Sequence, residues 1–590
     1  MAEQQNDTPN IFSLGTQPGV QRDGTNFDKR RYSNGVWTRF QRGRPRKMGG
    51  YVLMSDQTLG PVRNVRVDAR STENNAHLFS PWGIDRLSFD GSGIGGGIVS
   101  RTPSGFVGNL GYTWQSDTMF SSTGSAGVIV AAATPDALNI AENTAGPIYV
   151  GDQSTTGLFT QISDTVGPIL VSGGICVLQP FLFVYGSNGL IRNCDVNNFQ
   201  PAGWTVGGGS FANSANVAGS KIVCGLPTRG GGRSPAGLFW SLDSLIRVSF
   251  INSGSVIWQY DTVSAAISIL SKNSVIEVDG VYFWPGVDRF YAYSGVVQEL
   301  PNDFNSNFFF DNINFTHRNK VWVAKNNRFG EIWWFFPRGE STECNHALIY
   351  NFREKIWYDT ELSRSAGAAA EAFFRPIFAG GDLRVTVAVP VSGVAGAFAT
   401  NQTLTGVTSG AVGVLRRVTD TILNVEIISG AFVPAETVQV GGGAVASATV
   451  SGATTAQSLD SVWLHEQGRD RVYKSEVTAI RASIETDRFT WMSGGPSNDT
   501  PAGPDVQTRI TRVEPDFLME GDMNVYVSGA GYAAEASEVS SAYPITPTTA
   551  FISIREQRRE MSLIFESNVV GGHYETGRIL VQAEPGDERG

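Results

Sequence analysis

One hairpin pattern recurs along this chain and limits what it can fold into. An apolar strand runs into a short turn that carries Gly, Asp or Asn, and a second strand with aromatic or aliphatic alternation follows. The pattern is found at 76–91, 181–192, 237–249, 281–295 and 461–473. A repeat in the tens of residues is typical of propellers and solenoids, in which each unit buries its faces against its neighbours.

The longest copy of the pattern spans 331–359 and predicts one complete blade of a propeller. Two alternating segments, 331–336 and 345–351, flank a polar loop, and 355–359 closes the unit. Hairpins spaced by about 40 to 50 residues suit blades of four antiparallel strands. A β-sandwich is the competing fold, but it needs fewer strands than 590 residues supply. We therefore predict an all-β chain built on a β-propeller of five to seven blades.

The composition agrees with an all-β fold. The chain holds 68 Gly, 34 Phe, 16 Tyr and 13 Trp, and only 17% of its residues are charged. Aromatic side chains suit the pleated face of a strand, and glycines suit tight turns. The N-terminus is polar without an apolar leader, and no run of 18 apolar residues occurs. We expect a soluble protein, made in a cytoplasm, with no membrane span.

The cysteines do not predict a metal site or a disulfide scaffold. Cys176, Cys194, Cys224 and Cys344 lack the close pairs that either would need. We expect buried, reduced thiols and no metal or cofactor.

The composition changes near residue 387, which indicates a separate module. Residues 391–455 are nearly all Gly, Ala, Val, Thr and Ser, and they contain a duplication. The segments 396–398, 402–404 and 409–412 are echoed by 430–432, 436–438 and 442–445. Because the aromatic pattern resumes at Trp463, we predict a small β-barrel or sandwich inserted into a blade loop.

These boundaries divide the chain into four expected parts. Residues 1–60 form an N-terminal arm with a basic-aromatic segment, and 61–386 form the main part of the propeller. Residues 387–456 form the inserted module. Residues 457–590 are expected to supply the closing blades and an acidic C-terminal tail, because the strands at 551–555, 560–566 and 578–582 alternate again.

The densest charge cluster lies in the arm. It is interleaved with Tyr32, Trp37 and Phe40, and it consists of Lys29, Arg30, Arg31, Arg39, Arg42, Arg44, Arg46 and Lys47. Three interpretations stay open: contact with a neighbouring subunit, contact with DNA phosphate, or a solvated strand edge protected by charge. The net charge of −10 favours the first over the second.

The sequence contains no recognisable catalytic motif, so we predict that the protein is not an enzyme. The five histidines are scattered, and no nucleophile elbow or phosphate-binding loop is present. Asp85 and Asp288 lie in Gly-x-Asp-Arg turns and are expected to accept backbone N–H bonds there. Glu331 and Glu340 are the carboxylate pair for a glycan hydrolase, but nothing in the sequence holds them at a working separation.

Two segments resemble structural proteins of short-tailed bacteriophages, of the tail-nozzle or packaged-DNA stabilisation type. The first is 18–28 leading into 35–51, and the second is 281–295 with its core Trp-Pro-Gly-Val-Asp-Arg-Phe-Tyr. The resemblance implies a virion protein of the phage tail, assembled in the host cytoplasm as a closed ring, a hexamer, below the portal and adaptor. The implied partners are the tail adaptor, tail fibres or tailspikes, and the genomic DNA in the channel.

The leading hypothesis is therefore a nozzle subunit that retains packaged DNA and passes it during ejection. An acidic wall suits this role because it repels phosphate and lets DNA slide. The alternative is a receptor- or carbohydrate-binding propeller, in which Trp82, Trp114 or Trp204 would stack on sugars.

Overall fold

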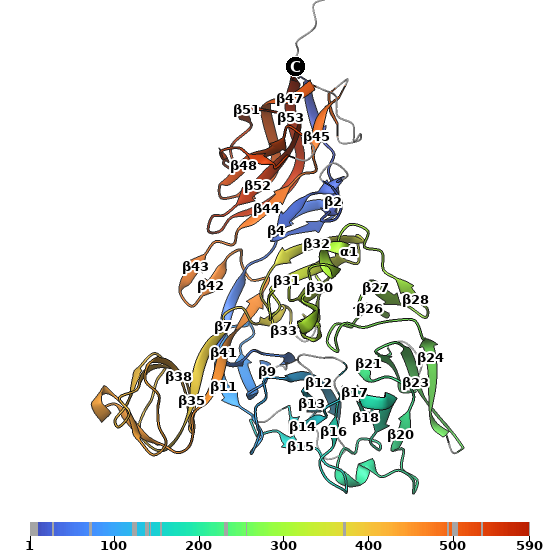
Figure 1. Cartoon of the computed structure of the whole chain (residues 1–590), viewed down its shortest axis with the longest axis vertical. Helices are drawn as coiled ribbons and strands as arrows, with labels where there is room; N and C mark the ends of the chain where they lie inside the picture. The colour runs from blue at the N-terminus through green and yellow to red at the C-terminus, as the bar shows by residue number, and fades with distance from the viewer. Residues whose placement is uncertain are drawn as a thin grey trace, which may run out of the picture.

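The computed structural model confirms the all-β prediction. It describes residues 10–25, 29–69, 74–120, 127–135, 141, 143–153, 156–228, 234–254, 256–369, 373–492, 495–497, 506–532 and 535–588. Within them the only α-helix is α1 (Ser306–Phe310), and the short 3-10 turns are η1 (Ser187–Gly189), η2 (Pro201–Trp204), η3 (Phe315–Lys320) and η4 (Gly441–Gly443). The other regular elements are all strands, joined by turns and loops (Figure 1).

Six antiparallel sheets follow one another along 64–361, and each pairs consecutive strands, with one exception in the second sheet. The first three contain β8 (Asn64–Ala69), β9 (Asn74–Ser80), β10 (Gly83–Phe89) and β11 (Gly95–Ser100); β12 (Tyr112–Phe120), β13 (Gly127–Pro135), β14 (Gly146–Asp152), β15 (Thr160–Gln161) and β16 (Leu170–Val171); and β17 (Gly174–Leu178), β18 (Phe181–Tyr185), β19 (Leu190–Asn193) and β20 (Asn213–Asn216). The exception is β16, which pairs with β14.

The next three sheets repeat this order. They contain β21 (Ile222–Pro227), β22 (Ala236–Ser241), β23 (Leu245–Ser253) and β24 (Val256–Ser264); β25 (Ile276–Val278), β26 (Val281–Pro285), β27 (Phe290–Tyr293) and β28 (Val297–Glu299); and β29 (Trp322–Asn326), β30 (Glu331–Phe336), β31 (His346–Asn351) and β32 (Ile356–Glu361). Separate hydrophobic clusters fill the spaces between adjacent sheets, which explains why most strands here are apolar on both faces.

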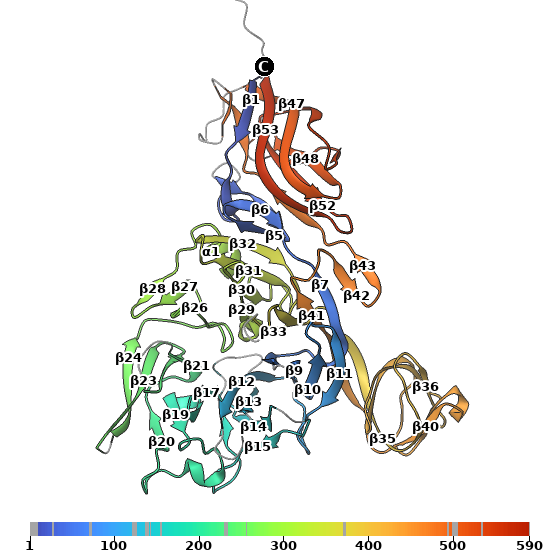
Figure 2. The same ribbon diagram turned by 180° about the vertical axis from the view of Figure 1, so that it is seen from behind.

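A seventh sheet draws its strands from three distant parts of the chain. Its order is β33 (Ala366–Ala368), β34 (Ile377–Ala379), β41 (Thr455–His465) and β7 (Tyr51–Gly60). β33 lies beside β8, so the last of the seven sheets contacts the first. β7 and β41 run antiparallel to each other along the side of the molecule (Figure 2). The small hairpin of β42 (Arg471–Tyr473) and β43 (Glu476–Thr478) extends this edge.

The segment with the internal duplication forms a closed six-stranded barrel. Its strands are β35 (Arg384–Gly396), β36 (Thr403–Gly406), β37 (Val412–Val418), β38 (Ile422–Ser429), β39 (Thr437–Val440) and β40 (Ala446–Val450), and pairing of β38 with β35 closes it. β36 pairs with β39, so the two copies of the duplicated sequence meet directly. Aliphatic side chains such as Leu404, Leu415 and Val438 fill its interior.

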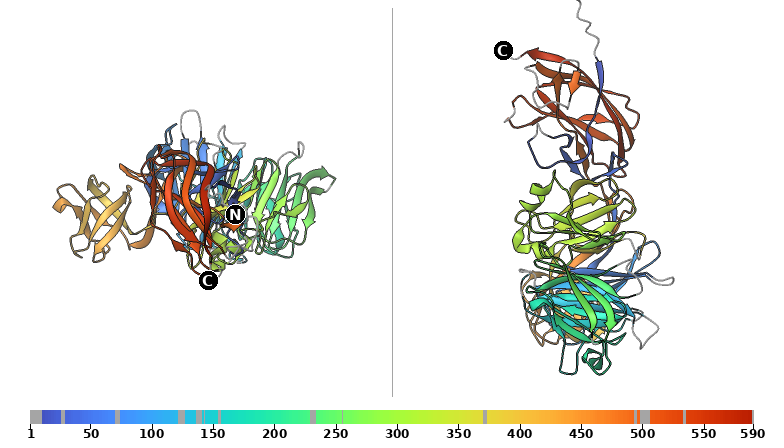
Figure 3. Two further views of the ribbon diagram at one scale, coloured as in Figure 1. Left: turned by 90° about the horizontal axis from the view of Figure 1, so that it is seen from above. Right: turned by 90° about the vertical axis from the view of Figure 1, so that its right-hand side faces the viewer.

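The barrel is connected through a two-stranded ribbon. The first half of β35 pairs with the first half of β41, with Arg384 opposite Leu459 and Ala388 opposite Thr455. The chain thus leaves the seventh sheet after β34, builds the barrel and returns in β41. Viewed from above, the barrel projects to one side of the molecule (Figure 3).

The two chain ends together build a further unit of two sheets. One contains β1 (Asn10–Leu14), β5 (Thr38–Gln41), β6 (Arg44–Lys47), β47 (Val506–Glu520), β51 (Ile552–Arg558) and β53 (His573–Glu588). The other contains β4 (Asn34–Val36), β44 (Ala482–Glu485), β45 (Phe489–Met492), β46 (Gly495–Ser497), β48 (Met523–Ala530), β49 (Glu538–Val539), β50 (Tyr543–Ile545) and β52 (Glu560–Ser567). β2 (Gln17–Val20) and β3 (Arg31–Tyr32) form a separate two-stranded parallel pair.

This unit corrects the expectation that 457–590 supplies closing blades and an acidic tail. Among the described strands of this range, β41 and the short β42 pair with β7 of the seventh sheet, whereas β44 to β53 pair with each other and with the N-terminal arm. Residues 584–588 belong to β53 instead of a free tail, and 589–590 lie outside the described residues. The physical reason is that alternation predicts which side of a strand is buried but not which strand lies beside it.

Candidate functional site

The centre of the predicted basic-aromatic arm is buried inside the protein. Arg39 on β5 is 1% exposed, and its guanidinium donates to Glu331 of β30 at 2.8 and 3.1 Å and to Glu466 at 2.9 Å. It also lies 3.7 Å from the centre of the Phe329 ring. Burial lowers the pKa of Arg39, but the two carboxylates outweigh it and hold that pKa above its usual value. Arg39 therefore joins the N-terminal arm to the sheets and is not free to bind DNA.

Of two further cations of the arm, Lys47 is buried and Arg31 is half-buried. Lys47 on β6 is 2% exposed, its Nζ has no hydrogen-bond partner among the described residues, and burial lowers its pKa. The Arg31 guanidinium donates to the carbonyl of Pro18 and lies 4.9 Å from the Phe304 ring centre. The Arg31 contacts therefore help to hold the arm in place within the chain.

The remaining members of the arm are wholly or partly exposed. Arg44 and Arg46 approach Glu575 at 3.9 and 4.0 Å, which are loose contacts. Arg30 and Arg42 are exposed, and Lys29 is half-buried. Contact with a second molecule through the arm could therefore use these five side chains and not the whole predicted set.

The carboxylate pair considered for glycan hydrolysis is not brought together. Glu331 begins β30, is fully buried and is bound to Arg39. Glu340 lies beyond the other end of the same strand and is exposed. Of the tryptophans considered for sugar stacking, Trp114 and Trp204 are core residues and only Trp82 is half-buried.

The predicted burial of the four cysteines is confirmed. Cys176, Cys194, Cys224 and Cys344 are all buried free thiols. Burial raises the pKa of each, to about 12 for Cys194 and Cys224, so the thiolate that metal binding or nucleophilic attack needs is disfavoured.

Asp85 accepts a backbone N–H as predicted, but its partners lie outside its own turn. Its carboxylate accepts from the Leu59 amide of β7 at 2.9 Å and binds Arg417 of the barrel at 2.5 and 2.7 Å. Asp85 and Arg417 are 1% and 4% exposed. This buried pair fastens the barrel to the first sheet. Asp288 is instead paired with the neighbouring Arg289 at the surface.

A central cavity of about 420 Å³ lies where the first strands of the seven sheets meet. Residues of β8, β12, β17, β21, β25, β29 and β33 all line it. Its wall is largely polar, with Arg66 and Asp117 paired at 3.3 Å and Lys272 contacting Thr134. A cavity of this volume is far too small to admit a DNA duplex.

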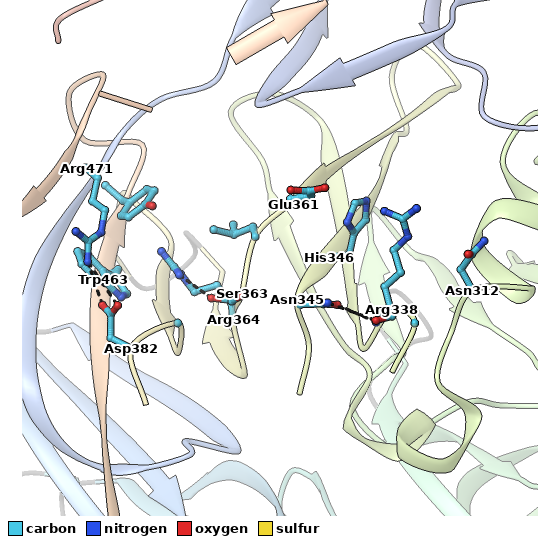
Figure 4. A pocket seen from close by; sticks show the side chains of 14 residues that line it. Asn312, Arg338, Asn345, His346, Glu361, Ser363, Arg364, Asp382, Trp463 and Arg471 are labelled. Carbon is cyan, nitrogen blue, oxygen red and sulfur yellow. Dashed lines mark hydrogen bonds and ion pairs between the residues drawn. The ribbon is translucent and has the colours of Figure 1, made fainter. Parts of the chain in front are cut away.

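A larger cleft of about 760 Å³ opens beside the sixth and seventh sheets (Figure 4). The turn after β30, the end of β32, the loop before β35, and strands β7, β41 and β42 supply its wall. Three arginines, Arg338, Arg364 and Arg471, lie in it with Glu361 and Asp382. Asp382 is loosely paired with Arg471 at 3.4 Å.

His346 at the cleft wall belongs to a network of hydrogen bonds that extends through the buried Asp359 to the N-terminal arm. Its Nε2 lies 2.8 Å from Asp359, and the same carboxylate accepts from Arg22 at 2.8 and 3.0 Å. Burial raises the pKa of Asp359, but Arg22 and His346 outweigh it and lower that pKa to about 2. The carboxylate is thus committed to structural bonds.

Sequence reasoning did not find the cleft. Glu361 and Arg364 precede the β33–β34 hairpin and Asp382 follows it, and Trp463 and Arg471 come only after the barrel. The one local signal is the pair Gly380 and Gly381, because adjacent glycines often mark a close approach of backbone to another group.

The described residues contain no cluster of His, Cys, Asp and Glu that could hold a metal ion. No helix in this part of the chain is long and apolar enough to cross a membrane. Comparison of the chain with protein-family models and with curated proteins gave no match.

Proposed function

We propose that the seven sheets are the blades of a β-propeller. Four observations support this: each sheet has four main strands, the sheets follow in chain order, β33 contacts β8, and first strands from all seven line the central cavity. Pairing β7 with β41 places an N-terminal strand in the last blade. Strands from both parts of the chain thereby pair where the ring of sheets closes, and no unpaired edge is left between them. The number of blades is then seven.

We propose that the protein is a structural subunit of a phage tail nozzle. The main support for this proposal is the arrangement of the parts: the seven sheets bear a barrel on one side and a two-sheet unit at one end (Figures 1 and 3). Such projections offer separate surfaces for neighbouring subunits and for other tail proteins. The resemblance of 18–28, 35–51 and 281–295 to nozzle proteins supports the same role.

The size of the central cavity restricts where DNA could pass. A cavity of about 420 Å³ excludes a duplex from the middle of the seven sheets. The proposed channel therefore lies on the axis of a closed ring of copies, a hexamer, with each chain forming one sector of the wall. The tail adaptor would contact the ring at one end, and fibres or tailspikes would bind its outside.

The deciding experiment is native mass spectrometry and particle imaging of the purified full-length chain. We expect a six-fold ring with an axial opening wide enough for duplex DNA. Charge reversal at the exposed arm residues, R30E/R42E/R44E, should reduce ring formation, whereas R289E on the fifth sheet should not. A stable monomer or trimer that binds glycans would contradict the proposal and support a receptor-binding role.

A further inference from the structure

Arg364 is a buried guanidinium without a carboxylate partner. It is 4% exposed, and no ion pair in the described part of the chain includes it. Burial lowers its pKa, and the nearby Tyr51, Asp382 and Asp460 offset that effect only in part. An isolated buried charge is costly, so a protein normally pairs it or leaves room for a ligand that does.

Two of the three nitrogens of Arg364 are fully engaged. Nε donates to Nε2 of His465 at 3.0 Å, and one terminal nitrogen donates to the carbonyls of Ser363 and Gly380 at 2.6 and 3.2 Å. Burial and the neighbouring Arg364 hold the pKa of His465 well below its usual value, which suits an imidazole that must accept this bond. The other terminal nitrogen is buried and makes no hydrogen bond of normal distance and angle to any described residue, although the Tyr51 side chain lies close to the guanidinium and helps to stabilise its charge.

Aromatic rings and a glycine pair hold this guanidinium in place. Its central carbon lies 4.8 Å from the Tyr51 ring centre and 5.4 Å from that of Trp463. Gly381, at φ +105°, passes so close that a Cβ there would lie 2.7 Å from the terminal nitrogen that bonds the carbonyls. Gly380, at φ +112°, approaches the Arg364 backbone in the same way. The guanidinium is thus preorganised.

The free nitrogen belongs to a side chain that lines the 760 Å³ cleft, together with further donors. Figure 4 shows Arg364 between Ser363 and Trp463, with Arg471 on one side and Asn345 and Arg338 on the other. Three arginines face the carboxylates of Glu361 and Asp382, which leaves a local excess of positive charge in a chain whose net charge is −10.

We propose that this cleft binds an oxyanion, a phosphate or carboxylate group, through the unpartnered nitrogen of Arg364. One anion oxygen accepts from that nitrogen, and Ser363 and Arg471 at the cleft rim bind the others. Charge-assisted bonds of this kind are the strongest polar contacts that such a cleft can offer. The inference rests on the cleft alone and does not depend on a role in a phage tail.

The test is isothermal titration calorimetry of the full-length protein with sodium phosphate and, separately, with sodium acetate. We expect saturable binding of one anion per chain in at least one of the two titrations. Tighter binding of phosphate would identify a phosphate site, and tighter binding of acetate would identify a carboxylate site.

Three variants assign the binding to the cleft. R364Q should weaken it at least tenfold, and R471Q, at the rim, should weaken it several-fold while leaving Arg364 in place. R289Q removes a surface arginine on another sheet and should bind as the wild type does. If R364Q does not fold, the anion affinity of R471Q alone tests whether the anion binds in this cleft. The absence of saturable binding with both anions, or wild-type affinity in R471Q and in a folded R364Q, would overturn the proposal.

Discussion

At the scale of single residues, buried charges connect parts of this chain that are far apart in sequence. Arg39 joins the N-terminal arm to Glu331 and Glu466, and Arg22 joins it to Asp359. Breaking such a pair leaves a charge without its partner in a place that water does not reach, which costs far more than losing a surface contact.

The substitution R39M tests the central connection. It leaves Glu331 buried without its counter-ion, so we expect the free energy of unfolding to fall by about 3–5 kcal/mol. The matched control is R44M, on the next strand, where the side chain is 63% exposed and a change below about 0.5 kcal/mol is expected. Denaturant titration measures both. Equal decreases in the free energy of unfolding in the two variants would show that the Arg39–Glu331 pair does not stabilise the fold more than a surface contact does.

Asp460 predicts a pH dependence of stability. It is 2% exposed on β41, and burial raises its pKa from 3.8 to about 6. The folded state therefore holds the proton more tightly than the unfolded state, so this group's favourable contribution is present below about pH 4 and is lost as the pH rises to 6.

The variant D460N removes this titration. Between pH 4 and 6 the wild type should lose up to ~3 kcal/mol of unfolding free energy relative to D460N, at 1.36 kcal/mol for each pKa unit. Chemical denaturation at several pH values measures the difference. Parallel pH profiles for the two proteins would exclude a raised pKa at Asp460.

At the scale of elements, the barrel has a core of its own and is attached to the seven sheets at two places. Its six strands close on themselves and enclose their own apolar core. Two connections hold it: the ribbon of β35 with β41, and the buried pair of Arg417 with Asp85. The barrel therefore has a fixed orientation and is not a flexible appendage.

Deleting the barrel tests this attachment. Ala388 and Thr455 are paired across the ribbon, so an Asn-Gly turn can join them in place of 389–454. We expect the shortened chain to fold. D85N should cost about 3–5 kcal/mol in the full chain, where it leaves Arg417 buried and unpaired, and at most ~1 kcal/mol in the shortened chain. Thermal and denaturant unfolding of the four proteins gives both values, and equal costs would contradict the attachment.

At the scale of the whole molecule, negative charge predominates, and part of the basic arm is not accessible to a ligand. The net charge is −10, and Arg39 and Lys47, two of the eight cations in the basic arm, are buried. Phosphate binding needs several accessible cations on one surface. The proposed nozzle would then guide DNA without holding it tightly.

We accordingly expect no saturable binding of a short labelled DNA duplex at ~0.15 M salt, measured by fluorescence anisotropy. The control is R42Q/R44Q, which removes exposed cations of the arm. Binding by the wild type that this variant loses would show that the arm grips DNA and would contradict the proposed passive wall.

The sequence was enough to predict the all-β class, the burial of the four cysteines and a separate small β module, a barrel or a sandwich, within 387–456. These follow from local composition and alternation, which decide how each segment buries its own apolar face. Only the tertiary structure decided that 482–588 pairs with the N-terminal arm, that Arg39 is internal and that Arg364, Trp463 and Arg471 share a cleft. Such groupings depend on which distant strands become neighbours, and strand alternation carries no information about that choice.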